Sequence, residues 1–180
     1  ESRAGMVECF EAFARQARAV VAGADDPEAA RLGRAVGGIS FGFAEEAEYR
    51  GEVLEAGPGG TRFAVRAPDG RRREAWLQLT GRHNVLNALA ALAACERQGG
   101  IDLDDACAAL AGFRLPRRRF EPVAHARGIR VVADYAHHPS EIRSLIAAAR
   151  QAGAGRIWAV FQPHRYTRTR ALGAEFPPAF

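Results

Sequence analysis

Lysine is absent from this chain of 180 residues, in which all 25 basic residues are arginine. Glycine-rich phosphate loops end in Gly-Lys-Thr or Gly-Lys-Ser, where the lysine reaches the nucleotide phosphates. The sequence therefore excludes a complete phosphate loop of that kind within residues 1–180.

Cysteine is scarce, with Cys9, Cys95 and Cys107 at irregular spacings. An odd number at such spacings fits neither a disulfide framework nor a zinc site. Cys95 and Cys107 lie in Ala- and Leu-rich helical sequence, which predicts buried thiols. We therefore expect a reducing, cytoplasmic setting.

Long apolar runs are also missing, since no stretch approaches the roughly 20 apolar residues that cross a bilayer. The first five residues do not lead from a basic segment into an apolar core, as a signal peptide would. The composition, 48% apolar and 26% charged, is typical of globular proteins. We predict no membrane partner.

Charge is unevenly distributed along the chain. Residues 1–116 carry 14 arginines and 17 acidic residues, whereas residues 117–180 carry 11 arginines and four acidic residues. The basic final third favours an anionic partner, such as phosphate, carboxylate or nucleic acid, although a solvated arginine-rich surface has the same composition. Neither a helix-turn-helix nor an aromatic-plated sheet is evident, so we predict no nucleic-acid partner.

Hydrophobic spacing and turn residues predict the elements of residues 1–122. Pro27 after Asp26 is typical of a helix start. Alternating segments separated by glycine-rich turns favour an antiparallel meander. We expect helices at 7–19, 27–35, 84–98 and 102–111, short strands at 19–22 and 38–43, and meander strands at 49–54, 61–66 and 74–79.

Residues 129–134, 140–152 and 157–161 read as strand, helix and strand. Such a βαβ unit implies a parallel sheet, with ligands at the carboxyl ends of its strands. The polar segments 134–139 and 162–166 would then share one edge. A domain boundary is expected near 121–128.

Four polar constellations could carry chemistry. Asn84 and Asn87 are helical neighbours suited to reading a base edge, although Asn84 could be a helix cap and His83 a surface residue. The run 117–119 suits phosphate or carboxylate, although it could be a solvated charge run.

The other two constellations follow the predicted strands. Asp134 suits a sugar hydroxyl, whereas a metal site on His137 and His138 is disfavoured because adjacent extended residues point apart. Arg165 and Arg168 could clamp one carboxylate.

Residues 81–88, 118–121, 134–139 and 161–169 occur in this order and spacing in the Mur ligases, which the chain resembles over nearly its whole length. The resemblance implies an α/β fold. Residues 1–122 would be the second half of a P-loop-type ATPase central domain with a small antiparallel meander. Residues 123–180 would be the first βαβ part of a Rossmann-like C-terminal, amino-acid-binding domain.

The last motif is most similar to the members that add L-alanine to UDP-N-acetylmuramate through an acyl phosphate, in peptidoglycan precursor synthesis. The resemblance implies ATP and Mg²⁺ as cofactors of a longer parent protein. Two alternatives remain open. One is another Mur-type or folylpolyglutamate-type ligase, and the other is a non-catalytic nucleotide-binding module.

The resemblance also implies roles for individual residues, with no metal ligand among them. Nucleotide contacts would come from His83, Asn84, Asn87, Arg119 and Asp134. Amino-acid contacts would come from Tyr135, His164, Arg165 and Arg168, and the catalytic set would be His137, His164, Arg165 and Arg168.

The chain departs from the family pattern in several places. Leu79-Thr80 replaces the usual Val-Pro, Ala133 replaces a common Asp, and the phosphate loop and metal ligands are missing. The sequence also ends inside an expected helix, at 177–180. We therefore expect the isolated chain to lack ligase activity.

Overall fold

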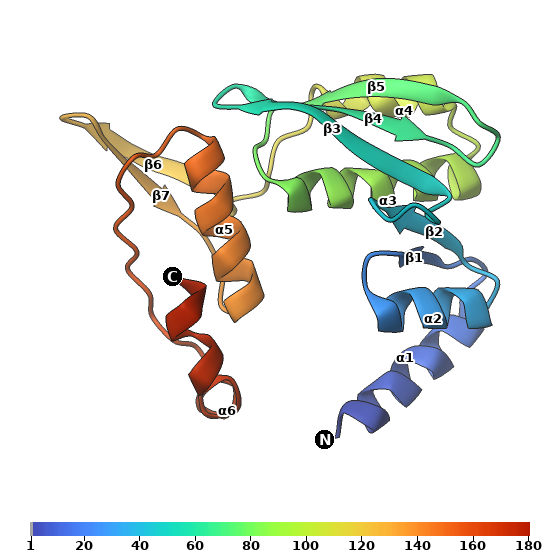
Figure 1. Cartoon of the computed structure of the whole chain (residues 1–180), viewed down its shortest axis with the longest axis horizontal. Helices are drawn as coiled ribbons and strands as arrows, with labels where there is room; N and C mark the ends of the chain where they lie inside the picture. Colours follow the sequence, from blue (N-terminus) through green and yellow to red (C-terminus); the bar gives the residue numbers. More distant parts are fainter. Residues whose placement is uncertain (1) are drawn as a thin grey trace.

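A computed structural model describes residues 2–180 and contains a five-stranded sheet in the order β1-β2-β3-β4-β5 (Figure 1). The first three strands pair in parallel and the last three pair antiparallel. The predicted meander is therefore confirmed, and the sheet is mixed. The strands are β1 (Val21–Gly23), β2 (Ile39–Gly42), β3 (Tyr49–Gly57), β4 (Gly60–Arg66) and β5 (Arg72–Leu77).

Four helices accompany this sheet: α1 (Arg3–Gln16), α2 (Pro27–Ala35), α3 (Arg82–Gly99) and α4 (Leu103–Leu110). The helix predicted over residues 27–35 is confirmed with both of its ends. It begins after Asp26 because the Asp26 carboxylate accepts hydrogen bonds from the backbone N–H groups of Glu28 and Ala29. Helix α1 begins and ends earlier than predicted, since the Ser2 hydroxyl accepts from Gly5 N–H and starts it.

The core lies between α3 and the strands. Gly51 on β3 allows the close approach, because a Cβ there would lie 2.5 Å from Cδ1 of Leu89. Burial raises the pKa of Cys107 to about 11, so this predicted buried thiol stays protonated and unreactive. The largest fully buried apolar side chains are Phe63, Val65, Leu77, Val85, Leu89, Leu92 and Leu103.

A partly buried polar network ties the meander to α3. The Tyr49 hydroxyl donates to the Glu96 carboxylate at 2.7 Å, and Arg71 bonds the other oxygen of that carboxylate. Arg71 also bonds Asp69 at 2.5 Å. Burial, followed by the bond to Glu96, raises the pKa of Tyr49 well above its usual value. The tyrosine therefore remains a hydrogen-bond donor throughout the physiological range.

A second, two-stranded sheet follows the linker after α4 (Figure 1). Strands β6 (Glu121–Ala126) and β7 (Ile129–Ala133) form an antiparallel hairpin. Strand β6 was not predicted from the sequence. Both loop residues, Arg127 and Gly128, have positive φ, as a type I′ turn requires. The remaining elements are α5 (Pro139–Gln151), α6 (Tyr166–Ala171) and the 3₁₀ turns η1 (Gly173–Glu175) and η2 (Pro177–Ala179).

The predicted strand at 157–161 is wrong, and with it the βαβ unit. The segment is extended but has no strand partner among residues 2–180, and β7 pairs with β6 alone. Trp158 is 84% exposed and Val160 fully exposed. Phe161 instead packs on Phe176 and Phe180. An apolar run indicates burial, but a strand forms only where a neighbour supplies hydrogen bonds.

The end of the chain also differs from the expected continuing helix. Residues 177–179 form a 3₁₀ turn, and Phe176 and Ala179 pack with Ile142 of α5 in a small apolar cluster. Within residues 2–180, no helix has the length and apolar character needed to cross a membrane.

Replacing Leu89 tests the core. Leu89→Ala should lower the free energy of unfolding by about 2–5 kcal/mol, because a fully buried leucine leaves a cavity against β3. Urea denaturation followed by circular dichroism measures this. Leu86, on the same helix and only partly buried, is the control. An equal loss for Leu86→Ala would contradict the placement of the core.

Candidate functional site

A cleft of about 820 Å³ lies between the start of α3, the linker before β6, the end of β7 and α5. It brings together residues separated by more than 50 positions in the sequence. Its apolar wall includes Leu79, Phe113 and Leu145. Seven residues singled out from the sequence line it: His83, Asn84, Asn87, Arg119, Asp134, Tyr135 and His137.

The start of α3 forms one wall of the cleft. Gly81 is the N-cap, with φ of 103°, and a Cβ there would lie 2.7 Å from the His83 ring. Asn84 is buried, and its amide donates to the carbonyl of Thr80 at 2.7 Å. The interpretation of Asn84 as a helix cap is therefore wrong, because the amide fastens the strand end to the helix. Asn87, one turn later, is exposed in the cleft.

His83 is half-buried beside these amides, which contradicts the alternative that it is a surface residue. Burial lowers its pKa, and the nearby Asp134 carboxylate only partly offsets this effect. The imidazole is therefore neutral at pH 7. A neutral ring suits contact with an uncharged base rather than with a phosphate.

The opposite wall is the hinge segment, defined as residues 117–121. Arg118 and Phe120 have φ of 61° and 45°, which is unusual for residues other than glycine. The Arg118 carbonyl accepts from Tyr135 N–H at 2.8 Å, and its guanidinium lies 4.9 Å from the centre of the Tyr135 ring. Tertiary contacts therefore hold this tight backbone. Arg119 between them is exposed and lines the cleft.

Asp134 joins the hinge segment to the end of β7. One carboxylate oxygen accepts from Phe120 N–H at 2.7 Å and the other from Ala136 N–H at 2.6 Å. Each oxygen retains a second lone pair, which accepts no hydrogen bond within residues 2–180. The carboxylate thus orders the backbone and keeps capacity to accept a sugar hydroxyl.

The loop after β7 depends on Glu141, which lies in the helix predicted over residues 140–152 and was not expected to contribute to the site. Its carboxylate accepts from the backbone N–H groups of His137 and His138 at 2.8 and 3.0 Å. Burial alone would raise the pKa of Glu141, but these bonds and the two histidines lower it overall. The missed signal is a glutamate three residues after the N-cap His138, which forms a capping box.

The remaining predicted residues lie elsewhere. His164 precedes α6, Arg165 is its N-cap and Arg168 lies within the helix, and none of them lines the cleft. Arg165 is the N-cap of α6, with φ of 71°. Nη1 of Arg168 is buried without a hydrogen-bond partner in the described chain. The expected gathering of segments 134–139 and 162–166 on one sheet edge is therefore not seen in this structure.

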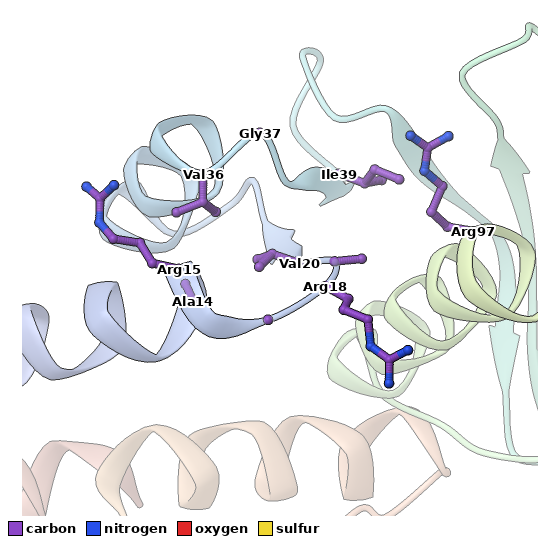
Figure 2. A pocket seen from close by; sticks show the side chains of 10 residues that line it. Ala14, Arg15, Arg18, Val20, Val36, Gly37, Ile39 and Arg97 are labelled. Carbon is purple, nitrogen blue, oxygen red and sulfur yellow. The ribbon is translucent and has the colours of Figure 1, made fainter.

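A smaller cavity of about 460 Å³ lies where α1 and α3 end, beside β1 and β2 (Figure 2). Arg15, Arg18 and Arg97 border it, and Figure 2 shows their guanidinium groups pointing in different directions. Arg15 and Arg97 stand in the last turns of their helices, where they complement the helix dipoles. None of the residues singled out from the sequence lies here.

The role of Asp134 in the hinge can be tested by hydrogen exchange. Asp134→Asn replaces one accepting oxygen by an NH₂ group, so at least one of the amides of Phe120 and Ala136 should exchange about 10-fold faster or more, as expected for a lost bond to a charged group. Glu46→Gln, at an exposed carboxylate distant in sequence from the hinge segment, is the matched control. Unchanged exchange at both amides would contradict this role.

Comparison with known proteins follows the same division of the chain. The family described as "Mur ligase middle domain" matches residues 4–95, and that described as "Mur ligase, glutamate ligase domain" matches residues 118–180. The UDP-N-acetylmuramate–L-alanine ligase of Clavibacter michiganensis subsp. michiganensis is 44% identical over 181 aligned positions, covering 96% of this chain and 37% of the relative. That of Kineococcus radiotolerans is 46% identical, covering 87% and 34%.

A solved structure agrees with these relatives. The UDP-N-acetylmuramate–alanine ligase of Thermotoga maritima superposes with a TM-score of 0.78 at 34% identity, covering 96% of this chain and 39% of that one. The predicted α/β fold class is confirmed by this match. The chain spans between 34 and 39% of the length of these three proteins. With a family match over more than half of its residues, the chain belongs to the Mur ligase family.

Proposed function

We propose that the protein containing this chain is an ATP-dependent ligase that joins L-alanine to UDP-N-acetylmuramate through an acyl phosphate. The observation that carries the proposal is the cleft, which gathers His83, Asn87, Asp134 and Tyr135 from the segments matched by both Mur ligase families. The two relatives named as L-alanine ligases from Clavibacter and Kineococcus are 44% and 46% identical to the chain, which favours alanine over other amino acids.

The chemistry of the cleft fits the adenosine part of ATP. Asn87 offers a free amide and His83 a neutral ring to the base. Asp134 would accept ribose hydroxyls on its remaining lone pairs, and the Arg119 guanidinium would face the phosphates. Asn84, already bonded to Thr80, would present its remaining donor and oxygen to the base.

Bound ATP would supply the phosphoryl group that activates the lactyl carboxylate as an acyl phosphate. Mg²⁺ is a family cofactor, but residues 2–180 contain no cluster of three or more His, Cys, Asp or Glu side chains that could hold a metal ion. We therefore assign no metal ligand to this part of the protein.

The amino-acid side of the reaction would use Tyr135, His137, His164, Arg165 and Arg168. The carboxylate of L-alanine and the tetrahedral intermediate are both anionic, so a pair of guanidinium groups would hold and stabilise them. The buried, unpartnered Nη1 of Arg168 supports this assignment, since such a donor is costly without an acceptor. The α6 segment would have to approach the cleft to complete the site.

We also propose that residues 1–122 belong to the central ATP-binding domain and residues 123–180 to the C-terminal domain. The ends of the two family matches, at 95 and 118, support a junction in this part of the chain. A reaction that consumes ATP and a nucleotide-activated sugar is consistent with a cytoplasmic protein.

Nucleotide contact can be tested on the chain itself by titrating ADP and following amide resonances by NMR. Shifts should concentrate at His83, Asn87 and Tyr135. Asn87→Ala should weaken binding by about 5- to 10-fold, because it removes one or two hydrogen bonds to the base. Gln98→Ala, exposed near the end of the same helix, is the control. Equal affinity for both variants would contradict the adenine contact.

The alanine assignment requires the full protein that contains this chain. Phosphate release with ATP and UDP-N-acetylmuramate should depend on L-alanine, and Arg165→Ala should raise the KM for L-alanine by roughly 10-fold or more, as for a lost charged hydrogen bond. Arg170→Ala, at an exposed arginine of the same helix, should leave KM unchanged.

A panel of other amino acids separates the alternatives. Release that depends on another amino acid would favour a different Mur-type or folylpolyglutamate-type ligase. ADP binding without any amino-acid-dependent phosphate release would favour a non-catalytic nucleotide-binding module.

A further inference from the structure

We propose that Glu141 is a positioning residue that holds His137 as its Nδ1–H tautomer, leaving Nε2 as the proton acceptor for the incoming amine. The chemical part of this inference rests on the proposed ligase function. The structural part, the tautomer and its dependence on Glu141, stands on the geometry of the loop between β7 and α5.

The tautomer follows from one hydrogen bond. Nδ1 of His137 lies 2.8 Å from the backbone carbonyl of Tyr135, and a carbonyl oxygen only accepts. Nδ1 must therefore carry the hydrogen. In the neutral ring Nε2 then carries no hydrogen, and it makes no hydrogen bond within residues 2–180. The ring lines the cleft, with 26% of its side-chain surface accessible.

The adjacent histidine is held in the opposite form. Ser140 N–H donates to Nδ1 of His138 at 3.3 Å as part of the helix cap. Nδ1 of His138 is therefore unprotonated, and Nε2 carries the hydrogen. Two neighbouring histidines in one loop thus have different tautomers, each fixed by a backbone partner. The arrangement indicates that the loop specifies the protonation pattern of each ring.

Glu141 fixes the backbone that sets this pattern. Its Oε2 accepts from the N–H groups of both histidines and also lies 3.6 Å from Nδ1 of His137. The pKa of Glu141 is lowered despite burial, so the carboxylate is charged at neutral pH. A negative charge on the Nδ1 side favours a hydrogen at that nitrogen. Tyr135, which contacts the His137 ring edge-on at 5.0 Å, limits its rotation.

The other charged and titratable groups that line the cleft with this ring come from several elements. They are His83 of α3, Arg119 of the hinge segment, Asp134 and Tyr135 of the loop, and Glu141 of α5. His138 is the next residue in the chain. The carboxylate of Asp134 accepts from the backbone N–H groups of Phe120 and Ala136. The backbone N–H of His137 donates instead to the carboxylate of Glu141.

The proposed step is a proton transfer followed by amide formation. The α-ammonium of the amino acid gives one proton to Nε2 of His137, producing a free amine and an imidazolium. The amine nitrogen then forms a bond to the acyl carbon. The C–O bond to phosphate breaks with its electron pair, and the amide nitrogen releases its second proton to solvent. Imidazolium returns the first proton to solvent, which restores the base.

The structural claim is tested by ¹⁵N NMR of the histidine-labelled chain at pH 8, independently of any activity. His137 should show a protonated Nδ1 and His138 a protonated Nε2, with a His137→Gln spectrum giving the assignment. Glu141→Ala should convert His137 to a mixture of tautomers. Glu141→Gln, which keeps an accepting oxygen, should retain the Nδ1–H form. A protonated Nε2 in wild-type His137 would overturn the proposal.

The chemical claim is tested on the full protein with ATP, UDP-N-acetylmuramate and L-alanine. Glu141→Ala should lower kcat by roughly 10- to 100-fold, with KM for ATP unchanged and with the acid limb of the kcat pH profile displaced. Glu141→Gln should restore most of the activity but keep the displaced acid limb, because it lacks the charge of the carboxylate. Thermal unfolding checks that both variants are folded, and if Glu141→Ala is not, the displaced pH profile of Glu141→Gln alone decides.

The outcomes separate this inference from the proposed function. If the wild-type protein showed no ligation, the proposed function would be wrong. The NMR result would still test the tautomer of His137 independently. Wild-type ligation with an unaltered kcat and pH profile in folded Glu141→Ala would leave the ligase assignment intact and overturn the role of Glu141.

Discussion

The two hydrogen bonds that Asp134 accepts from Phe120 and Ala136 decide how the hinge segment crosses the end of β7. Arg118 and Phe120 hold left-handed backbone angles there, which cost free energy unless contacts compensate. The hydrogen bonds to the Asp134 carboxylate offset this free-energy cost, and they hold Arg119 and Tyr135 on the lining of the same cleft. If these bonds were lost, the linker from α4 could take many courses, and the two walls of the cleft would separate.

The other walls rest on the same principle, in which side chains satisfy backbone groups at the ends of elements. Asn84 bonds the carbonyl of Thr80, and the Thr80 hydroxyl bonds the carbonyl of Ala148 on α5. Glu141 satisfies the first amides before α5. Each bond removes an otherwise unsatisfied buried or partly buried polar group. The polar residues of the cleft therefore have a structural task as well as a capacity for ligands.

Prediction from sequence succeeded where the signal was local. Asp26 before Pro27 specifies the start of a helix, and the alternation of apolar and polar residues specifies the meander strands. The amides at 84 and 87 likewise mark one end of a helix. None of these signals depends on residues far away in the sequence. It failed at 157–161, where the apolar run has strand character but no strand partner, and at β6, where a hairpin turn without the usual Asn-Gly sequence was overlooked. For the site, the five expected nucleotide residues converge together with Tyr135 and His137, while His164, Arg165 and Arg168 remain apart.

The sequence by itself determined the family, the order of the elements in residues 21–110 and the identity of the polar residues at the cleft. These features depend on spacing along the chain and on side-chain chemistry. Only the tertiary structure decided that Asp134 holds the hinge, that Glu141 orders two histidines of opposite tautomer, and that Asn84 is buried while Asn87 is open to the cleft. The physical reason is that a hydrogen bond between residues far apart in sequence exists only after packing has brought its donor and acceptor within about 3 Å of each other.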